Sequence, residues 1–394
     1  MKRLLTAIFL AMPLLISAEE SDDSIMPNAN EIGAETVNEE RQEGLLISAD
    51  ALAFFRDNEY DSKLTTGYSL PGVWVRPKVE YNPNRNIHLE LGAHALFFDG
   101  ANKYPNYAYH DIGKWKGNQY QYGVHILPWF RAQAEMKNMS VVLGDIYGDL
   151  NHGIITPLYN KEQVMSADPE MGAQILVHSK GFKMDAFVNW QSYQFKEDTH
   201  QEAFTVGLIG RQKLTRNLSA VLDVLVQHRG GEQDLPELEL GVQTICNGAI
   251  GLRWTSDYNP QAKVINGYNA SINLLGCYQQ AGHLWPFDSG MAIHAEAGVD
   301  IIKQLSACVG YFYAPKEFIS VYGNPFFSTM NYLNQGIRYN GMQTGYLSVD
   351  YHHTFAEHYT LGAMLETFSP HSDGLSEFNF SFGLYLRVNP SWKL

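Results

Sequence analysis

The segment that most constrains the fold is residues 377–389, EFNFSFGLYLRVN, near the end of the chain. Every second residue from Phe378 to Val388 is apolar, whereas the residues between them are mostly polar. Because successive side chains of a β-strand point to opposite faces, the segment presents one apolar and one polar face. An apolar face this long and aromatic is typical of a strand of about 9–11 residues that crosses a bilayer. An amphipathic strand of a soluble β-sandwich is the alternative.

The same alternation recurs in residues 87–98, 182–191 and 291–301. In the first of these, Leu89 and Leu91 fall on the apolar face, and His88 and Glu90 fall on the opposite face. A soluble sandwich does not require several apolar faces of this length. The repeated pattern therefore predicts a transmembrane β-barrel with lipid outside and polar residues inside.

Turn signals divide residues 44–394 into strands joined alternately by short and long connections. Short turns are expected near residues 82–86, 137–138, 179–181, 214–217, 258–260, 303–304 and 355–358. Longer loops are expected near residues 56–63, 99–118, 148–169, 196–201, 229–236, 281–288, 316–340 and 370–375. This asymmetry predicts an all-β, antiparallel transmembrane barrel of about sixteen strands, with fourteen as the alternative, short periplasmic turns and longer extracellular loops. The first strand, residues 45–55, alternates least regularly.

The composition agrees with a barrel. Aromatic residues make up 13% of the chain, including 23 Tyr and 20 Phe, whereas charged residues make up 18%. Abundant Tyr and Phe fit the aromatic girdles that flank the lipid-facing band of such barrels. A helical membrane protein would instead need apolar runs of about 18 residues, and the sequence beyond the N-terminus contains none.

The N-terminus has the features of an export signal. Residues 1–18 combine Lys2 and Arg3, an apolar stretch and a small-residue exit at Ser17 and Ala18, which predicts a cleavable signal peptide. Residues 19–43 contain nine acidic residues and one arginine, which predicts a disordered, acidic periplasmic tail. A docking site for a protein partner is the alternative role of this tail.

The whole chain carries a formal charge of −14. Residues 1–18 contribute two positive charges and residues 19–43 contribute nine acids against one arginine, which leaves −8 for residues 44–394. An acidic barrel disfavours nucleic acid and anionic surfaces as partners. Outer-membrane lipid and small polar solutes are the expected partners.

Several stretches of sequence resemble porin-like outer-membrane β-barrel proteins of Bacteroidota type. They are FFRDNEYDSKLTTGYSLPG, LGDIYGDLNHGIITPLYN, EMGAQILV and MDAFVNWQ, at residues 54–72, 143–160, 170–177 and 184–191. The resemblance implies the barrel fold and a location in the outer membrane of a Gram-negative bacterium. It says less about the solute, because such families are functionally mixed.

We find no sequence motif for a nucleotide, a metal or a catalytic serine, so no cofactor and no metal are expected. Barrel enzymes use His, Asp and Ser near the outer rim. Two loops offer such residues, namely Asp149, Asn151 and His152 in one and residues 371–373 in the other. Exposed loops are rich in these residue types in any case, so we expect a protein that is not an enzyme.

Charged and polar residues on the inward parity of the predicted strands are the candidate pore lining. They are Glu90, His94, His125, Arg131, Lys183, Asp185, Asp223, Glu239, Arg253, His294, Glu296, Asp300, Asp350 and Arg387. A sixteen-stranded barrel is wide enough for a water-filled lumen, in which such charges select solutes. They predict a porin-like channel for passive diffusion of small polar solutes or ions, with a modest cation preference.

The loop at residues 148–169 is the candidate constriction, because it carries apolar residues that a fully hydrated loop does not need. These are Ile154, Ile155, Pro157, Leu158 and Tyr159. They either fold into the lumen or contact a protein partner. The alternative function follows from the second option: a non-conducting structural barrel subunit of an outer-membrane assembly or transport complex, with its extracellular loops or acidic tail against a partner.

Overall fold

The computed structural model describes residues 43–98, 123–192, 202–230, 242–283, 285–331, 334, 336–356 and 358–394, and every structural statement below concerns them. The predicted signal peptide, all but the last residue of the predicted tail, and Glu239 lie outside this range.

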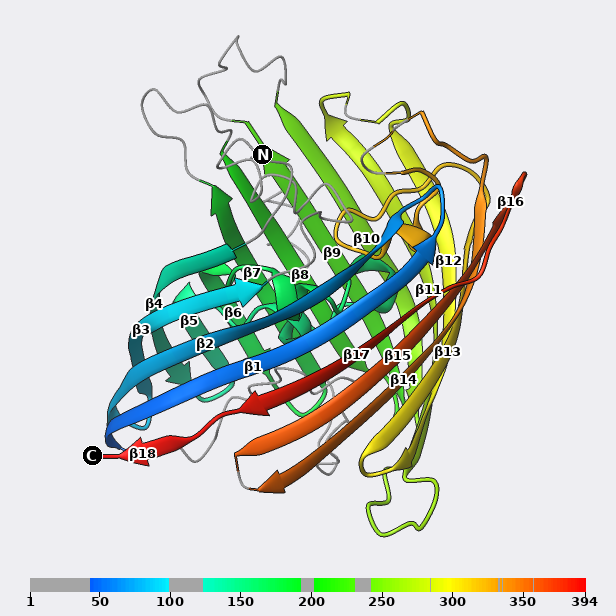
Figure 1. Ribbon diagram of the computed structural model, residues 1–394. Helices are drawn as coiled ribbons and strands as arrows, with labels where there is room; N and C mark the ends of the chain where they lie inside the picture. The colour runs from blue at the N-terminus through cyan, green and yellow to red at the C-terminus, as the bar shows by residue number, and fades with distance from the viewer. Residues whose placement is uncertain are drawn as a thin grey trace.

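The chain forms a closed, antiparallel β-barrel (Figure 1). Closure comes from β1 (Gly44–Asp61), which pairs with β2 on one side and with β17 (Asn379–Val388) on the other. Sixteen strands, β1 to β15 and β17, form the wall. Two short strands extend its ends: β16 (Leu375–Ser376) pairs with β15, and β18 (Ser391–Lys393) pairs with β1. The predicted fold class and the count of sixteen strands are confirmed.

The remaining wall strands follow the chain in order around the barrel. They are β2 (Thr66–Asn84), β3 (Ile87–Phe98), β4 (Gly123–Met136), β5 (Met139–Asp145), β6 (Met171–His178), β7 (Phe182–Ser192), β8 (Ala203–Lys213), β9 (Leu218–Arg229), β10 (Gln243–Thr255), β11 (Gly267–Ala281), β12 (Ser289–Ile302), β13 (Leu305–Ala314), β14 (Met342–Ala356) and β15 (Tyr359–Ser372).

The predicted short turns join strands at one end of the barrel, where the C-terminus also lies (Figure 1). The connection between β10 and β11, residues 256–266, is longer than predicted and protrudes from this end. The long loop predicted at residues 56–63 is wrong, because β1 continues to Asp61. The polar run at residues 56–59 reads as a loop, but its side chains alternate: Arg56 and Asn58 are buried, whereas Glu59 is exposed.

The outer face of the wall is apolar. Leu91 on β3 and Ile126 on β4 are 66% and 67% exposed, and their neighbours on the same parity are also apolar. Exposed aromatic residues lie near the strand ends, among them Tyr81, Tyr268 and Tyr359. This is the lipid-facing band that the sequence alternation predicts.

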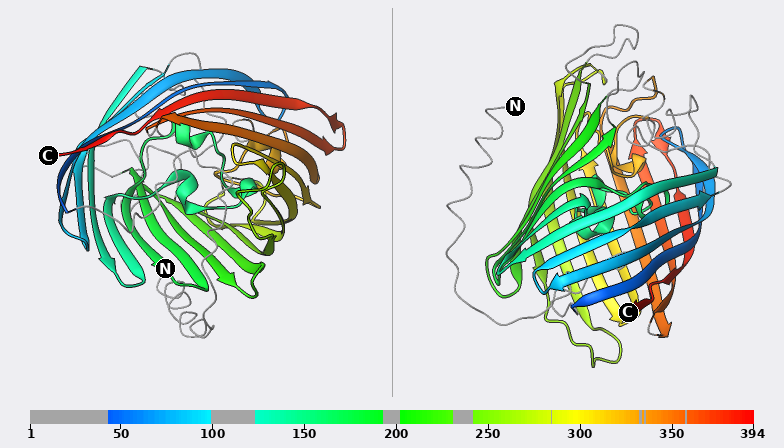
Figure 2. Two further views of the ribbon diagram at one scale, coloured as in Figure 1. Left: turned by 90° about the horizontal axis from the view of Figure 1, so that it is seen from below. Right: turned by 90° about the vertical axis from the view of Figure 1, so that its left-hand side faces the viewer.

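Two connections fold into the lumen instead of projecting from the barrel (Figure 2). The first, here called the inner loop, is residues 146–170 between β5 and β6. It contains two 3₁₀ helices and one short α-helix: η2 (Asp149–His152), η3 (Thr156–Leu158) and α3 (Gln163–Ser166). The second inner loop, residues 315–331 between β13 and β14, contains η5 (Pro325–Phe327). Across the described ranges, no helix combines the length and the hydrophobicity needed to cross a membrane.

The second inner loop fills part of the lumen with an apolar core. Phe318, Phe326 and Phe327 are fully buried there. Phe318 packs on Phe312 of β13, with ring centroids 5.5 Å apart, and Phe327 packs edge-on against Tyr346 of β14. Part of the inward-facing wall is therefore apolar because it contacts protein rather than water.

Candidate functional site in the lumen

The inner loop crosses the lumen and is attached to strands on different sides of the wall. Its Val164 carbonyl accepts a hydrogen bond from Trp74 Nε1 of β2 (3.0 Å). The Ile155 amide donates to Asp223 of β9 (2.9 Å). Lys161 donates to Ser348 of β14 (3.0 Å). These three attachments place the loop as a crossbar within the barrel.

A further attachment is a buried ionic network around Arg56 of β1. The Arg56 guanidinium is fully buried and contacts Glu366 of β15 at 2.6 Å and Glu162 of the inner loop at 3.2 Å. Ser381 of β17 accepts a further hydrogen bond from Arg56 (2.9 Å), and Asn58 donates to Glu162 (2.9 Å). One cation thus joins the start of α3 to three neighbouring strands.

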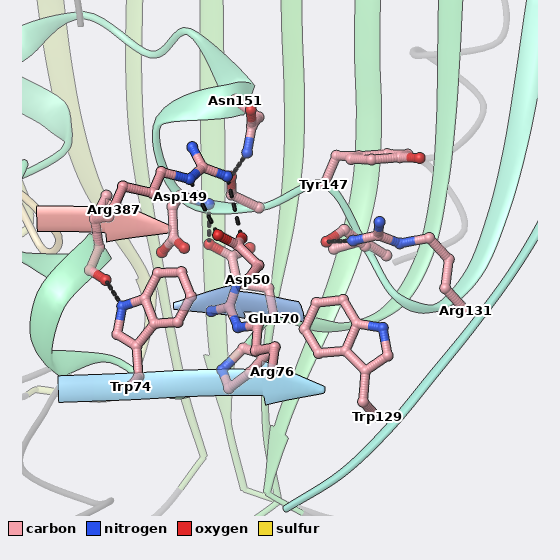
Figure 3. A pocket seen from close by; sticks show the side chains of 14 residues that line it. Asp50, Trp74, Arg76, Trp129, Arg131, Tyr147, Asp149, Asn151, Glu170 and Arg387 are labelled. Atoms are coloured by element: carbon pink, nitrogen blue, oxygen red, sulfur yellow. Dashed lines mark hydrogen bonds and ion pairs between the residues drawn. The ribbon is translucent and has the colours of Figure 1, made fainter. Parts of the chain in front are cut away.

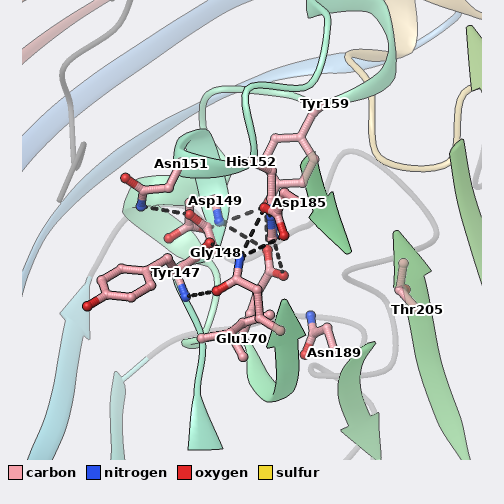
Figure 4. A network of polar contacts seen from close by, with 12 residues as sticks. Tyr147, Gly148, Asp149, Asn151, His152, Tyr159, Glu170, Asp185, Asn189 and Thr205 are labelled. Atoms are coloured by element: carbon pink, nitrogen blue, oxygen red, sulfur yellow. Dashed lines mark hydrogen bonds and ion pairs between the residues drawn. The ribbon is translucent and has the colours of Figure 1, made fainter. Parts of the chain in front are cut away.

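A second network holds η2 against the opposite wall (Figure 4). His152 lies between two carboxylates, with Nδ1 2.6 Å from Asp185 of β7 and Nε2 3.0 Å from Glu170. Burial by itself lowers the pKa of His152, but Glu170 and Asp185 outweigh it and raise this pKa to about 10. The imidazole is therefore a cation with both nitrogens donating. It is a clamp on the loop and cannot serve as a general base.

Beneath η2, a small recess opens into the lumen (Figure 3). One side is an alternating stack of aromatic and guanidinium groups. Arg76 lies 4.1 Å from the Trp74 ring and 5.0 Å from the Trp129 ring. Arg131 lies 5.1 Å from the Trp129 ring and 3.9 Å from the Tyr147 ring. Such cation–π contacts fix the planes of both guanidinium groups.

Asp149 lines the other side of the recess. Among the described non-glycine residues, Asp149 alone has a positive φ, 55°. This conformation directs its carboxylate toward the recess, while its amide donates to Glu170 (3.2 Å) (Figure 3). Burial and the charge of Glu170 raise the pKa of Asp149 to about 6. Left-handed backbone is uncommon outside glycine, and such strained residues cluster at functional sites.

The structure places most of the predicted lining residues inside the barrel, and pairs many of them. Glu90 is buried against Arg131 (3.2 Å), Lys78 (3.4 Å) and His88 (2.8 Å). The other pairs are Asp185 with His152, Asp223 with Arg211, Asp350 with Lys161, Arg387 with Asp50, His94 with Arg76, His294 with Tyr346 and Glu296 with Thr156. Arg253 and Asp300 are half-buried, and Lys183 is exposed near a turn. The side chain of His125 and all of Glu239 lie outside the described residues.

The predicted constriction residues belong to the inner loop. Leu158 and Tyr159 are buried, and Ile154 and Ile155 pack against the apolar core. Pro157 begins η3 with Thr156. Tyr159 also forms a β-bridge with Tyr322, which joins the inner loop to the second inner loop.

Sequence reasoning missed the residues that hold the inner loop. Arg56 and Asn58 were assigned to a loop, and Glu162, Lys161 and Glu366 were not selected. Continued alternation through residues 56–60 is the signal that could have recovered the first two. In the portion of the chain that the structure describes, no cluster of three His, Cys, Asp or Glu side chains could hold a metal ion.

A model of the lipid A 3'-O-deacylase-type family matches residues 37–394. The chain belongs to this family. Its description names an enzyme, so the expectation that this protein is not an enzyme is wrong. No curated protein sequence matches the chain.

Solved structures of other proteins are also similar to the chain. OccK5 (OpdH) of Pseudomonas aeruginosa has a TM-score of 0.49 at 10% identity, covering 89% of this chain and 98% of its own. OmpT of Vibrio cholerae has a TM-score of 0.48 at 10% identity, covering 88% and 100%. OpdK of Pseudomonas aeruginosa, solved with vanillate, has a TM-score of 0.46 at 12% identity, covering 88% and 99%.

Proposed function

We propose that the protein is an outer-membrane channel of narrow bore for small polar solutes or ions, in the envelope of a Gram-negative bacterium. The observation that carries this proposal is the inner loop, a crossbar inside a sixteen-stranded barrel that has an apolar outer face. A barrel of this size has room for an aqueous path, and a loop held at mid-lumen sets its width.

The channel has a modest cation preference in this proposal. Supporting it, residues 44–394 carry a net negative charge, and half-buried Asp300 lies on an inward-facing position of β12. Low-dielectric walls focus the field of such acids and favour cations. The selectivity weakens with salt, because the Debye length falls from about 10 Å at 0.1 M to about 3 Å at 1 M.

Conductance of the purified protein in planar bilayers tests the channel. Glu162→Gln removes one charge from the Arg56 network, so it loosens the inner loop and increases single-channel conductance. Glu59→Gln is the matched control: Glu59 is exposed on β1, the strand that carries Arg56, and its substitution leaves conductance unchanged. No conductance from the wild type or from Glu162→Gln contradicts the channel and favours a structural subunit bound to partners through its loops or tail.

A second function, hydrolysis of an ester-linked acyl chain of lipid A, is favoured by the family description. Among the described residues, one serine hydroxyl lies within hydrogen-bond distance of a histidine ring nitrogen on the exposed surface at one end of the barrel. Ser376 Oγ lies 3.0 Å from His371 Nε2, across the β15–β16 pairing at the end of the barrel opposite the C-terminus (Figure 1). Both residues are exposed, and His371 shares the outward parity of Leu361 and Leu365. We infer that lipid headgroups adjoin this end of the wall, beyond the apolar band.

The chemistry of this pair is nucleophilic acyl transfer. Ser376 Oγ attacks the ester carbonyl carbon as His371 Nε2 accepts the hydroxyl proton. The sugar oxygen then leaves with that proton, and water hydrolyses the acyl-serine to release the fatty acid. The predicted neighbour Ser372 takes no part in the pair, because its hydroxyl donates to the Gly341 carbonyl at 2.7 Å.

Mass spectrometry of lipid A incubated with the protein in mixed micelles tests this function. Loss of one acyl chain is expected with the wild type and with Ser372→Ala, and no loss is expected with Ser376→Ala or His371→Gln. Deacylation that persists in both of the latter variants assigns the chemistry to other residues. Lipid A that stays intact with the wild type removes the second function.

A further inference from the structure

The recess beneath η2 presents hydrogen-bond donors and acceptors in close alternation. Donors come from the stacked guanidinium groups of Arg76 and Arg131, and acceptors come from the carboxylates of Asp149 and Glu170. At its edge, Arg387 binds Asp50 through two contacts of 3.1 Å. The two signs are thus interleaved, and neither dominates the lining.

Neighbouring groups already engage several of these charges. Arg131 contacts Glu90 at 3.2 Å and donates from Nε to the Asp145 carbonyl at 2.6 Å. Glu170 accepts from Tyr159 (2.8 Å) and contacts His152 (3.0 Å). A fully charged solute in this site would have to displace such pairs or remain uncompensated, which is costly in a buried setting.

Asp149 lines the recess with a carboxylate that can accept hydrogen bonds from a solute. Tyr159 donates a long hydrogen bond to Asp149 Oδ1, at 3.5 Å, and the positive charges of Arg76 and His152 act on the same carboxylate. A carboxylate offers about four acceptor positions, so Asp149 can accept a hydrogen bond from a solute in addition to the one from Tyr159.

We propose that the recess binds a small, uncharged, hydroxyl-rich solute, with Asp149 accepting hydrogen bonds from its hydroxyl groups. A hydroxyl group both donates and accepts, so a polyol satisfies carboxylate and guanidinium groups together without adding a net charge. The edges of Trp74 and Trp129 supply the apolar part of the lining. This inference rests on the proposed channel, for which it names the class of solute.

Three probes of nearly equal size separate the effect of charge from that of the hydroxyl groups: glucose, gluconate and glucosamine. Binding to the purified full-length protein in detergent is followed by tryptophan fluorescence, because Trp74 and Trp129 lie in the recess. Glucose is expected to bind at least about tenfold more tightly than gluconate or glucosamine. Preference for either charged probe, or equal binding of all three, overturns the inference.

Substitution locates the site. Asp149→Asn keeps a residue that tolerates left-handed backbone and removes the charge-assisted acceptor, so glucose affinity falls about tenfold or more. Asp257→Asn, at an exposed position in the connection between β10 and β11, is the matched control and leaves binding unchanged. Equal affinity in both variants overturns the assignment to this recess, and the wild-type probe series decides the solute class if Asp149→Asn fails to fold.

The glucose-binding assay and the conductance assay test the recess and the channel independently. Conductance without glucose binding overturns this inference and leaves the channel in place. Glucose binding without conductance supports the recess and contradicts the channel.

Discussion

Replacing Arg56 by Met is the sharpest test of how the inner loop is held. The substitution keeps the length of the side chain but removes a cation that contacts both Glu366 (2.6 Å) and Glu162 (3.2 Å). Both carboxylates are buried, at 8% and 3% side-chain exposure, so they lose a partner without gaining water. Breaking a buried ion pair by removing one member costs about 3–5 kcal/mol.

The free energy of unfolding is measured by urea titration of the protein in detergent or lipid, with tryptophan fluorescence as the signal. We expect Arg56→Met to lower it by about 3–5 kcal/mol. Adding Glu366→Gln to Arg56→Met recovers part of the loss, because it removes one of the two carboxylate charges that have lost Arg56. The double-mutant cycle therefore shows a coupling energy of about 0.5–3 kcal/mol between the two sites.

Two results refute this reasoning. A cost below about 1 kcal/mol for Arg56→Met would place the pair in the range of exposed ion pairs, despite its burial. Strict additivity of Arg56→Met and Glu366→Gln would show that the two groups do not interact energetically.

Three further predictions concern the wall and the loop. Leu91→Arg puts a charge on the lipid face, so it lowers the free energy of unfolding by about 2–4 kcal/mol if residue 91 lies near the membrane midplane. Asn84→Arg, near a turn, is the control and is tolerated. Equal stability of the two variants in urea contradicts the lipid-facing assignment of Leu91. The His152 clamp stabilises the fold fully below its unfolded pKa of about 6.5, and this stabilisation is lost as pH rises through the folded pKa of about 10. Stability measured between pH 7 and pH 11 should fall for the wild type more than for His152→Gln, and parallel curves would show that the clamp is not the cause. Asp300→Asn reduces the cation preference seen as a reversal potential under a salt gradient, and an anion preference in the wild type would contradict the charge argument.

The alternation of residues along each strand was sufficient to predict the barrel, the number of its strands and most of its turns. Lipid contact imposes this pattern on every strand, and a period of two residues is visible in any local stretch such as residues 377–389. The sequence prediction ended the first strand at residue 55, although β1 continues to Asp61. Beyond residue 55 the outward-facing residues of β1 include Glu59, so the apolar alternation ends.

The pairing of charged side chains inside the lumen was decided by tertiary structure alone. Inward parity identified Glu90 and Asp185 as lumen-facing, but not that each is buried against a partner. Arg56 and Glu366 lie 310 positions apart in the chain. The alternation within a strand therefore cannot predict that these two side chains form an ion pair. The inner loop selects these partners when it folds inside, because every charge that it buries must be compensated there. Local patterning therefore set the face toward lipid, and long-range packing set the face toward the lumen.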